Sequence, residues 1–219
     1  MELLGFAAWS ALAGDSDTSR TEWAAVLDAW GQPHRRYHDR AHLAAVLGIV
    51  GELADAATDP AAVRLAAWYH DVVYDPHRGD NEAVSAERAR AGLRGLVPEA
   101  RVEEVARLVL LTAGHEADAG DANGAVLCDA DLAVLAGPPA SYAAYASAVR
   151  EEYGHLSDEE FTAGRIAVLE HLLGLETLFR LPAVAAEWTP LARANLTAEL
   201  SLLQSRSASS GAAPPPPAG

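Results

Sequence analysis

Residues 66–75 read AAWYHDVVYD, an apolar run that ends in the neighbouring pair His70 and Asp71. An imidazole and a carboxylate are both ligand types for a divalent metal ion. An ionised carboxylate at the end of an apolar helix is costly to bury unless it meets a cation or several hydrogen-bond donors. The stretch therefore predicts a buried helix that ends at a polar group suited to metal binding.

Two distant segments carry the same residue types. RRYHDRAH contains His38 and His42, and the later LCDADL contains Asp131 in an apolar context. The two histidines are four residues apart, so we expect both on one face of a helix that begins near Tyr37. One shared metal ion would satisfy the polar groups of all three segments at once.

The rest of the chain has a helical pattern. Apolar residues recur at helical spacing almost throughout, and alternating runs typical of β-strands are missing. We therefore predict an all-α protein with a single helical domain over residues 1–204. Helices are expected near residues 3–13, 20–31, 37–56, 60–72, 81–95, 98–113, 124–136, 139–154, 158–174 and 190–205.

Local signals mark where several of these helices begin. Ser19 with Glu22 and Ser157 with Glu160 have the spacing of a capping box. Pro60, Pro98 and Pro190 stand where a helix can start.

A low-complexity tail follows the last predicted helix. Residues 205–219 read SRSASSGAAPPPPAG, which cannot bury enough apolar area to offset the entropy of ordering. We predict that this tail is disordered.

The composition of the chain limits the classes of partner that it can bind. The chain has 219 residues, half of them apolar, and a formal net charge of −15. A strongly negative surface repels nucleic acid polymers and anionic membranes, so a small-molecule partner is expected. The single Cys128 excludes an internal disulfide and indicates a reducing, cytoplasmic location. No apolar run reaches the roughly 18 to 20 residues of a membrane span, and we interpret MELLGFAAWSALAG as a first helix, with a signal peptide as the alternative.

The order of His42, His70-Asp71 and Asp131 resembles the HD superfamily of metal-dependent phosphohydrolases, which has a His, His-Asp, Asp ligand pattern on an all-helical bundle. RYHDRAH resembles the YHNxxH segment of cyclic-nucleotide phosphodiesterases, and LCDADL resembles their CADL segment. HDVVYD resembles the HDVVED stretch of hydrolases that degrade (p)ppGpp. WYHDVVYDP, DNEAVSA and ARANLTAEL resemble a bacterial group of predicted HD phosphohydrolases, over roughly residues 20 to 204.

The resemblance implies one metal site formed by His42, His70, Asp71 and Asp131. Two imidazoles and two carboxylates suit Mn²⁺, Fe²⁺, Co²⁺, Zn²⁺ or Mg²⁺, and they leave positions open for water and a phosphate oxygen. The implied function is hydrolysis of a small phosphorylated metabolite or nucleotide by a metal-activated water. A non-catalytic module that binds metal or nucleotide is the alternative from another class.

Catalytic roles also follow from the resemblance. His38, the first histidine of its pair, corresponds to the residue that protonates the leaving oxygen, while Asp75 matches the second acid of HDVVED and is our candidate for positioning or deprotonating the attacking water. Tyr74 stands where that motif has Glu, which argues against (p)ppGpp as the substrate. Asp129 is interpreted as a cap or a partner of a ligand.

Four further residues are candidates for binding substrate: Arg36, Glu82, Thr112 and His115. Arg36 could neutralise a phosphate or be a plain surface arginine, and Glu82 could orient a water or favour the positive end of its helix. Thr112 and His115 end an apolar helix, where His115 could hold a phosphate, bind a second metal or cap the helix. HD oxygenases with two irons need further His ligands between His70 and Asp131, and this interval has only His77 and His115, so hydrolysis is favoured.

Overall fold

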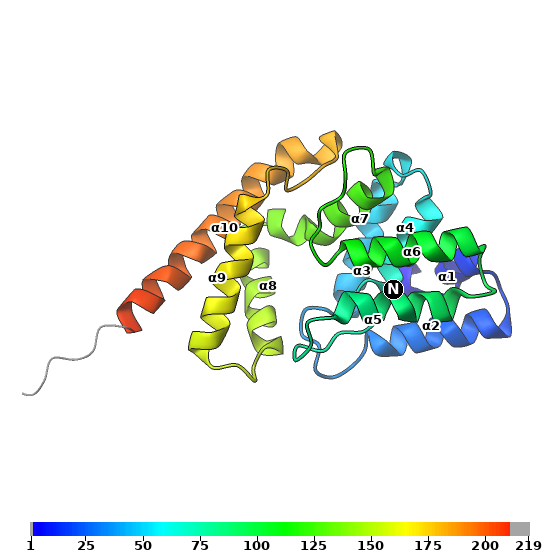
Figure 1. The fold of residues 1–219 in the computed structure, drawn as a ribbon, viewed down its shortest axis with the longest axis horizontal. Helices are drawn as coiled ribbons and strands as arrows, with labels where there is room; N and C mark the ends of the chain where they lie inside the picture. Colours follow the sequence, from blue (N-terminus) through cyan, green and yellow to red (C-terminus); the bar gives the residue numbers. More distant parts are fainter. Residues whose placement is uncertain (1, 211–219) are drawn as a thin grey trace, which may run out of the picture. The chain divides into compact units, whose positions relative to one another are not determined.

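The computed structural model describes residues 2–210 (Figure 1). The helices are α1 (Phe6–Ala13), α2 (Asp17–Ala29), α3 (Arg40–Glu52), α4 (Pro60–Tyr69), α5 (Asn81–Leu93), α6 (Glu99–Leu111), α7 (Ala122–Leu132), α8 (Pro139–Glu152), α9 (Asp158–Gly174) and α10 (Pro182–Ser210), with short 3₁₀ turns η1 (Glu2–Leu4), η2 (Ala54–Ala56) and η3 (Ala133–Ala136). No β-strand occurs in this part of the chain. The predicted all-α class is confirmed, and each of the ten predicted helices has a counterpart.

The described residues form two compact units. The first runs to Ala133 and is completed by the short segment Phe179–Pro182. The second consists of Val134–Leu178 and the chain from Ala183 onward. The prediction of one domain over residues 1–204 stays a prediction.

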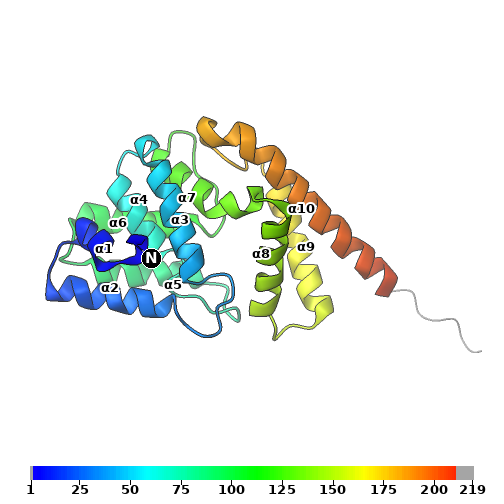
Figure 2. The ribbon, with the colours of Figure 1, turned by 180° about the vertical axis from the view of Figure 1, so that it is seen from behind.

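Helix α4 is central to the first unit. It packs against α1, α3, α5, α6 and α7, and Figure 2 shows α3 and α7 beside it. Contact on several sides explains why the sequence of α4 is apolar almost all round. Trp68 and Tyr69 fill the core: the Trp68 ring meets Trp9 edge to face, with ring centroids 5.4 Å apart, and the Tyr69 hydroxyl donates to Glu22.

The beginnings of α4 and α7 are joined by one side chain. Asn123, in the first turn of α7, accepts hydrogen bonds at Oδ1 from the backbone N–H groups of Thr58 and Asp59, at 2.9 Å each. Asp59 in turn caps α4, because its carboxylate accepts the N–H of Ala62 and Pro60 follows at the first helical position. The first turns of α4 and α7 are therefore held together, which fixes the position of one helix along its axis relative to the other.

The second unit contains α8, α9 and α10. Arg165 of α9 forms a bidentate ion pair with Glu199 of α10, with N–O distances of 2.8 and 2.9 Å. Tyr142 of α8 donates its hydroxyl proton to the same carboxylate. One buried network therefore links the three helices. Asn195 adds two hydrogen bonds from α10 to the carbonyls of Leu135 and Gly137.

Several helix boundaries differ from the prediction. Helix α10 begins at Pro182, not near Pro190, which lies inside the helix. The intervening residues include several alanines, which favour a helix strongly enough to carry it through Pro190 at the loss of one backbone hydrogen bond. Ser19 does not cap α2. Ser16 does, while the buried Ser19 hydroxyl accepts a hydrogen bond from Trp9.

Another difference concerns the tail. Helix α10 continues to Ser210, past the predicted start of disorder at Ser205, because adding residues to an existing helix costs less than starting a new one. Residues 211–219 of the predicted tail lie outside the described residues. The predicted capping box of Ser157 and Glu160 is present at the start of α9.

Candidate metal centre

His42 lies in the first turn of α3, whose start is set by Asp39. The Asp39 carboxylate accepts the backbone N–H groups of Ala41 and His42, at 2.7 and 3.2 Å, as a helix N-cap does. The helix therefore begins at Arg40, and the expectation that His38 belongs to it is wrong. The His42 side chain points inward and is only 4% exposed.

His70 ends α4, and its ring is fixed from both sides. Its Nδ1 lies 2.9 Å from the carbonyl oxygen of Ala67, which can only accept, so Nδ1 carries a proton. The ring stacks at a tilt against the buried Trp30, with centroids 5.2 Å apart. This arrangement aims Nε2 at the cluster, as a backbone partner on the other nitrogen does for metal-binding histidines. Trp30 gave no sequence signal of this role.

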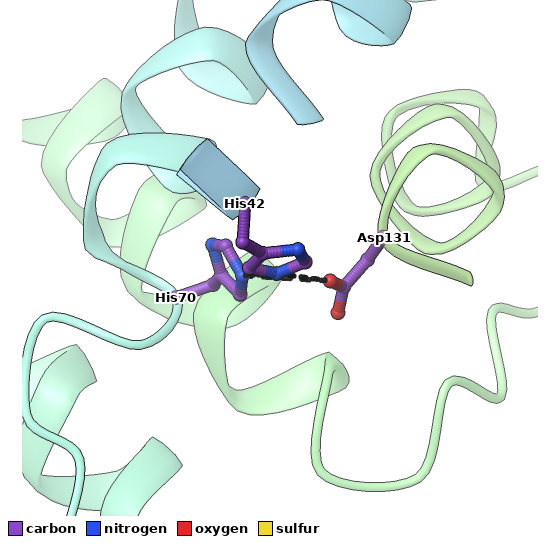
Figure 3. A group of neighbouring side chains, drawn as sticks. All are labelled: His42, His70 and Asp131. Atoms are coloured by element: carbon purple, nitrogen blue, oxygen red, sulfur yellow. Dashed lines mark hydrogen bonds and ion pairs between the residues drawn. The ribbon is translucent and has the colours of Figure 1, made fainter. Parts of the chain in front are cut away.

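The other three predicted ligands lie close to the Nε2 atom of His70, and Figure 3 shows two of them, His42 and Asp131, beside it. This Nε2 atom lies 3.2 Å from Nε2 of His42, 3.5 Å from Oδ1 of Asp131 and 3.3 Å from Oδ2 of Asp71. His42 Nε2 is also 3.1 Å from Asp131 Oδ1. Residues far apart in sequence thus converge from α3, α7 and the end of α4.

These separations fit the ligand shell of one ion. Two ligand atoms about 2.1 Å from one ion lie about 3.0 Å apart at a right angle and about 3.4 Å apart at the tetrahedral angle. Ligand atoms of His42, His70 and Asp131 all lie within 4.8 Å of one another, and they form a group that could hold a metal ion. Asp71 contacts the group through His70, at its edge. The donor set is mixed nitrogen and oxygen, which leaves the identity of the metal open.

The electrostatics of the cluster favour a cation. Burial works against the charged form of His70, but the nearby carboxylates of Asp71 and Asp131 outweigh it and raise the pKa of His70 well above its usual range. Burial also opposes ionisation of both carboxyls, yet His70 holds the pKa of each well below its usual range. Burial lowers the pKa of His42, so its imidazole is neutral. Two carboxylates around neutral or exchangeable imidazoles make a place that attracts positive charge.

His38 lies beside this cluster although it precedes α3. Its ring is 5.7 Å from that of His42 and stacks on Tyr74, with centroids 4.3 Å apart. It is close enough that its charge contributes to lowering the pKa of both His42 and Asp71. His38 therefore lies beside His42 with its own ring packed on Tyr74, and not as a member of the same helix.

Arg35, and not the predicted neighbour Arg36, holds the backbone on which the site is built. The Arg35 side chain is buried and donates from Nη1 to the carbonyl oxygens of His38 and Asp71, at 2.9 and 2.8 Å. Its Nη2 donates to the carbonyl of Val72. One planar guanidinium thus ties the segment before α3 to the segment after α4. An arginine next to a histidine motif was the available signal, but sequence does not reveal which of two adjacent arginines is buried.

Asp131 divides its two oxygens. Oδ1 faces His42 and His70, while Oδ2 accepts a hydrogen bond from Nε2 of His115 at 2.8 Å. Asp129, two residues earlier, faces another way and is fully buried. Its carboxylate accepts the backbone N–H groups of Arg180 and Leu181, which come just before α10, so Asp129 fixes the segment that leads into this helix.

Other predicted site residues make local contacts. Asp75 accepts the backbone N–H of His77, and the Thr112 hydroxyl donates to the Val109 carbonyl in its own helix. Glu82 lies in the first turn of α5, where an acid favours the helix dipole.

The exposed Arg36 donates to the carbonyl oxygens of Pro33 and Arg35, at 2.6 and 3.2 Å. The hydrogen bonds, ion pairs and ring contacts described here bring six predicted site residues together: His38, His42, His70, Asp71, Asp131 and His115. They do not join Asp75, Thr112, Glu82 or Arg36 to that group, and the roles of these four stay predictions.

Comparison with known proteins adds no second line of support. No family model matches the chain, and neither a curated protein nor a solved structure matches it. In residues 2–210, no helix is both long and apolar enough to cross a membrane. The function must therefore be argued from the geometry of the cluster.

Proposed function

We propose that this protein is a metal-dependent phosphohydrolase of the HD type that acts on a small phosphorylated metabolite or nucleotide. The observation that carries the proposal is the convergence of His42, His70 and Asp131 on one point, with Asp71 3.3 Å from His70. The sequence order of these residues is the order of the HD ligand pattern. The agreement of this order with the convergence of the side chains supports the proposal.

The side chains divide into distinct tasks. A divalent ion held by the cluster would lower the pKa of a bound water and draw charge from phosphoryl oxygens. His38, partly exposed beside the ligands, is placed to give a proton to a leaving alkoxide. Arg35 keeps the backbone of His38 and Asp71 at a fixed separation. The net charge of −15 favours a small substrate over a polyanion.

A non-catalytic binding module is the second candidate, and one observation favours it. The Asp75 carboxylate caps the turn at His77, so the predicted base is held within its own loop. Such a module would bind metal and nucleotide without turnover. The closeness of His38 to the ligands favours an enzyme.

The test begins with metal analysis of the purified protein. Release of phosphate from nucleotides and p-nitrophenyl phosphate is then measured with Mn²⁺, Co²⁺, Ni²⁺ and Mg²⁺. We expect about one ion per chain and metal-dependent turnover. Tight metal binding without turnover of any substrate would favour the binding module, and oxygen consumption with two irons per chain would favour an oxygenase.

Two variants test the assigned roles. His38→Ala and Asp75→Asn are expected to keep the metal and to slow turnover by roughly 10²-fold or more, the usual loss when an acid or base is removed. Unchanged turnover in Asp75→Asn would assign that residue to its turn alone. Loss of metal from His38→Ala would remove the distinction between acid and ligand.

A further inference from the structure

The backbone of His115 is unusual for its residue type. Among residues 2–210, His115 is the one non-glycine residue with a positive φ, 53°. It follows the end of α6, where its N–H donates to the carbonyl of Leu111. A helix end of this kind normally has Gly, and sometimes Asn, because a Cβ atom is disfavoured in the left-handed conformation. Gly114, the residue just before, could have supplied that flexibility, yet a histidine occupies the position.

The side chain of His115 uses this conformation to reach Asp131. Its Nε2 lies 2.8 Å from Oδ2 of Asp131, and the ring is 20% exposed. A carboxylate oxygen only accepts, so Nε2 donates. The other oxygen, Oδ1, lies 3.1 Å from His42 and 3.5 Å from His70. One oxygen of Asp131 is therefore engaged outside the cluster, and the other faces into it.

We propose that His115 is a positioning residue for the metal site. Its hydrogen bond fixes the rotation of the Asp131 carboxylate, so that Oδ1 faces the ion. This inference rests on the proposed metal site but not on phosphatase activity. Partners of this kind on a ligating carboxylate typically contribute a factor of about 10 to 100 to metal affinity.

A second metal ion is the rival explanation of the same contact. His115 and Asp131 together give that ion only two protein ligands. In the described chain, the one group of three or more side chains close enough to hold a metal is His42, His70 and Asp131. The geometry therefore favours a donor role for His115 over a ligand role.

Two substitutions at this position separate the roles of backbone and side chain. His115→Gly removes the donor but suits the positive φ, so relief of backbone strain should offset part of the stability lost with the hydrogen bond. His115→Gln replaces the ring with an amide N–H of similar reach that binds transition metals poorly. His171→Gln, at an exposed site on α9, is the control for exchanging a histidine for glutamine.

The measurements are calorimetric titration with Mn²⁺ and thermal unfolding of the metal-free proteins. We expect His115→Gly to weaken Mn²⁺ binding about 10- to 100-fold while the protein still unfolds cooperatively, and His115→Gln to keep most of the wild-type affinity. Wild-type affinity in His115→Gly overturns the inference, as does a second Mn²⁺ per chain that His115→Gln abolishes. A wild-type protein that binds no Mn²⁺ would instead contradict the proposed metal site itself.

Discussion

Each unit of this protein contains a largely buried group of charged side chains, and the carboxylates in the two groups have different partners. In the second unit, the carboxylate of Glu199 meets the permanent cation of Arg165, with two N–O distances below 3 Å. In the first, Asp71 and Asp131 meet only imidazoles among their described ion-pair partners. Arginine is always charged, whereas a histidine can give its proton up to a metal ion. The first kind of group stabilises a fold, and the second is suited to hold a cation.

Removing a ligand should give the largest effect. His70→Ala or Asp71→Ala is expected to leave the purified protein without bound metal, because each removes a donor from a site with few to spare. Metal content by elemental analysis checks this. Retention of a full equivalent of metal in both variants would contradict the site.

Breaking the ion pair of the second unit should affect stability and leave metal binding alone. Arg165→Met leaves Glu199 buried without its cation, which typically costs about 3 to 5 kcal/mol. Urea unfolding measures the loss. The double variant with Glu199→Leu should recover most of it, since an apolar pair of similar size often replaces a buried ion pair without cost. Weaker metal binding in Arg165→Met would show that the two groups are not independent.

Substituting Arg35 should affect both the stability of the fold and metal binding. Arg35→Met leaves the carbonyls of His38, Asp71 and Val72 without this donor, which we expect to cost roughly 2 to 4 kcal/mol and to weaken metal binding as well. Lysine should not rescue it, because a point charge cannot replace a planar fork. Arg78→Met, which breaks an exposed ion pair, is the matched control and should leave stability nearly unchanged. Equal effects of the two substitutions would refute the role given to Arg35.

The smallest effect is expected at the cap of α4. Burial opposes ionisation of Asp59, but hydrogen bonds from Arg101 and the helix N–H outweigh it and lower the pKa of Asp59 below 3.8. The folded state therefore binds this proton less readily than the unfolded state, and the stabilisation is present above about pH 4 and lost as the pH falls through the lower value. Asp59→Ala should cost about 1 kcal/mol at pH 7 and much less in acid. Stability curves against pH that run parallel for the two proteins would contradict this.

Sequence periodicity was enough to predict the helices, because α4 and its neighbours have apolar residues where helices bury them. The members of the candidate metal site were also predictable, since His70, Asp71 and Asp131 are polar groups in apolar runs. Arg35 and Trp30 were missed because nothing local distinguishes a buried arginine or tryptophan from its neighbours.

The position of His38 was misjudged for a different reason. The N-cap Asp39 makes the helix begin at Arg40, two residues after His38, and a cap of this kind depends on the hydrogen bonds of one side chain. Pro182 was likewise passed over as a start of α10. The two residues just before Pro182, Arg180 and Leu181, are held by Asp129, which is 51 and 52 residues earlier in the sequence. A contact between residues so far apart leaves no local pattern in the sequence.

The bond from Asp129 to Arg180 and Leu181 bears on how the protein can be divided. The unit that contains the candidate metal site is discontinuous: its chain leaves after Ala133 and returns for only four residues, Phe179–Pro182. A fragment ending at Ala133 would keep every predicted ligand. It would, however, remove the N–H groups of Arg180 and Leu181 that donate to the buried Asp129 carboxylate, two residues before Asp131. A shortened protein that keeps the predicted ligands should therefore also keep those four residues. They can be kept in the native chain or joined to Ala133 by a designed linker in place of Val134–Leu178.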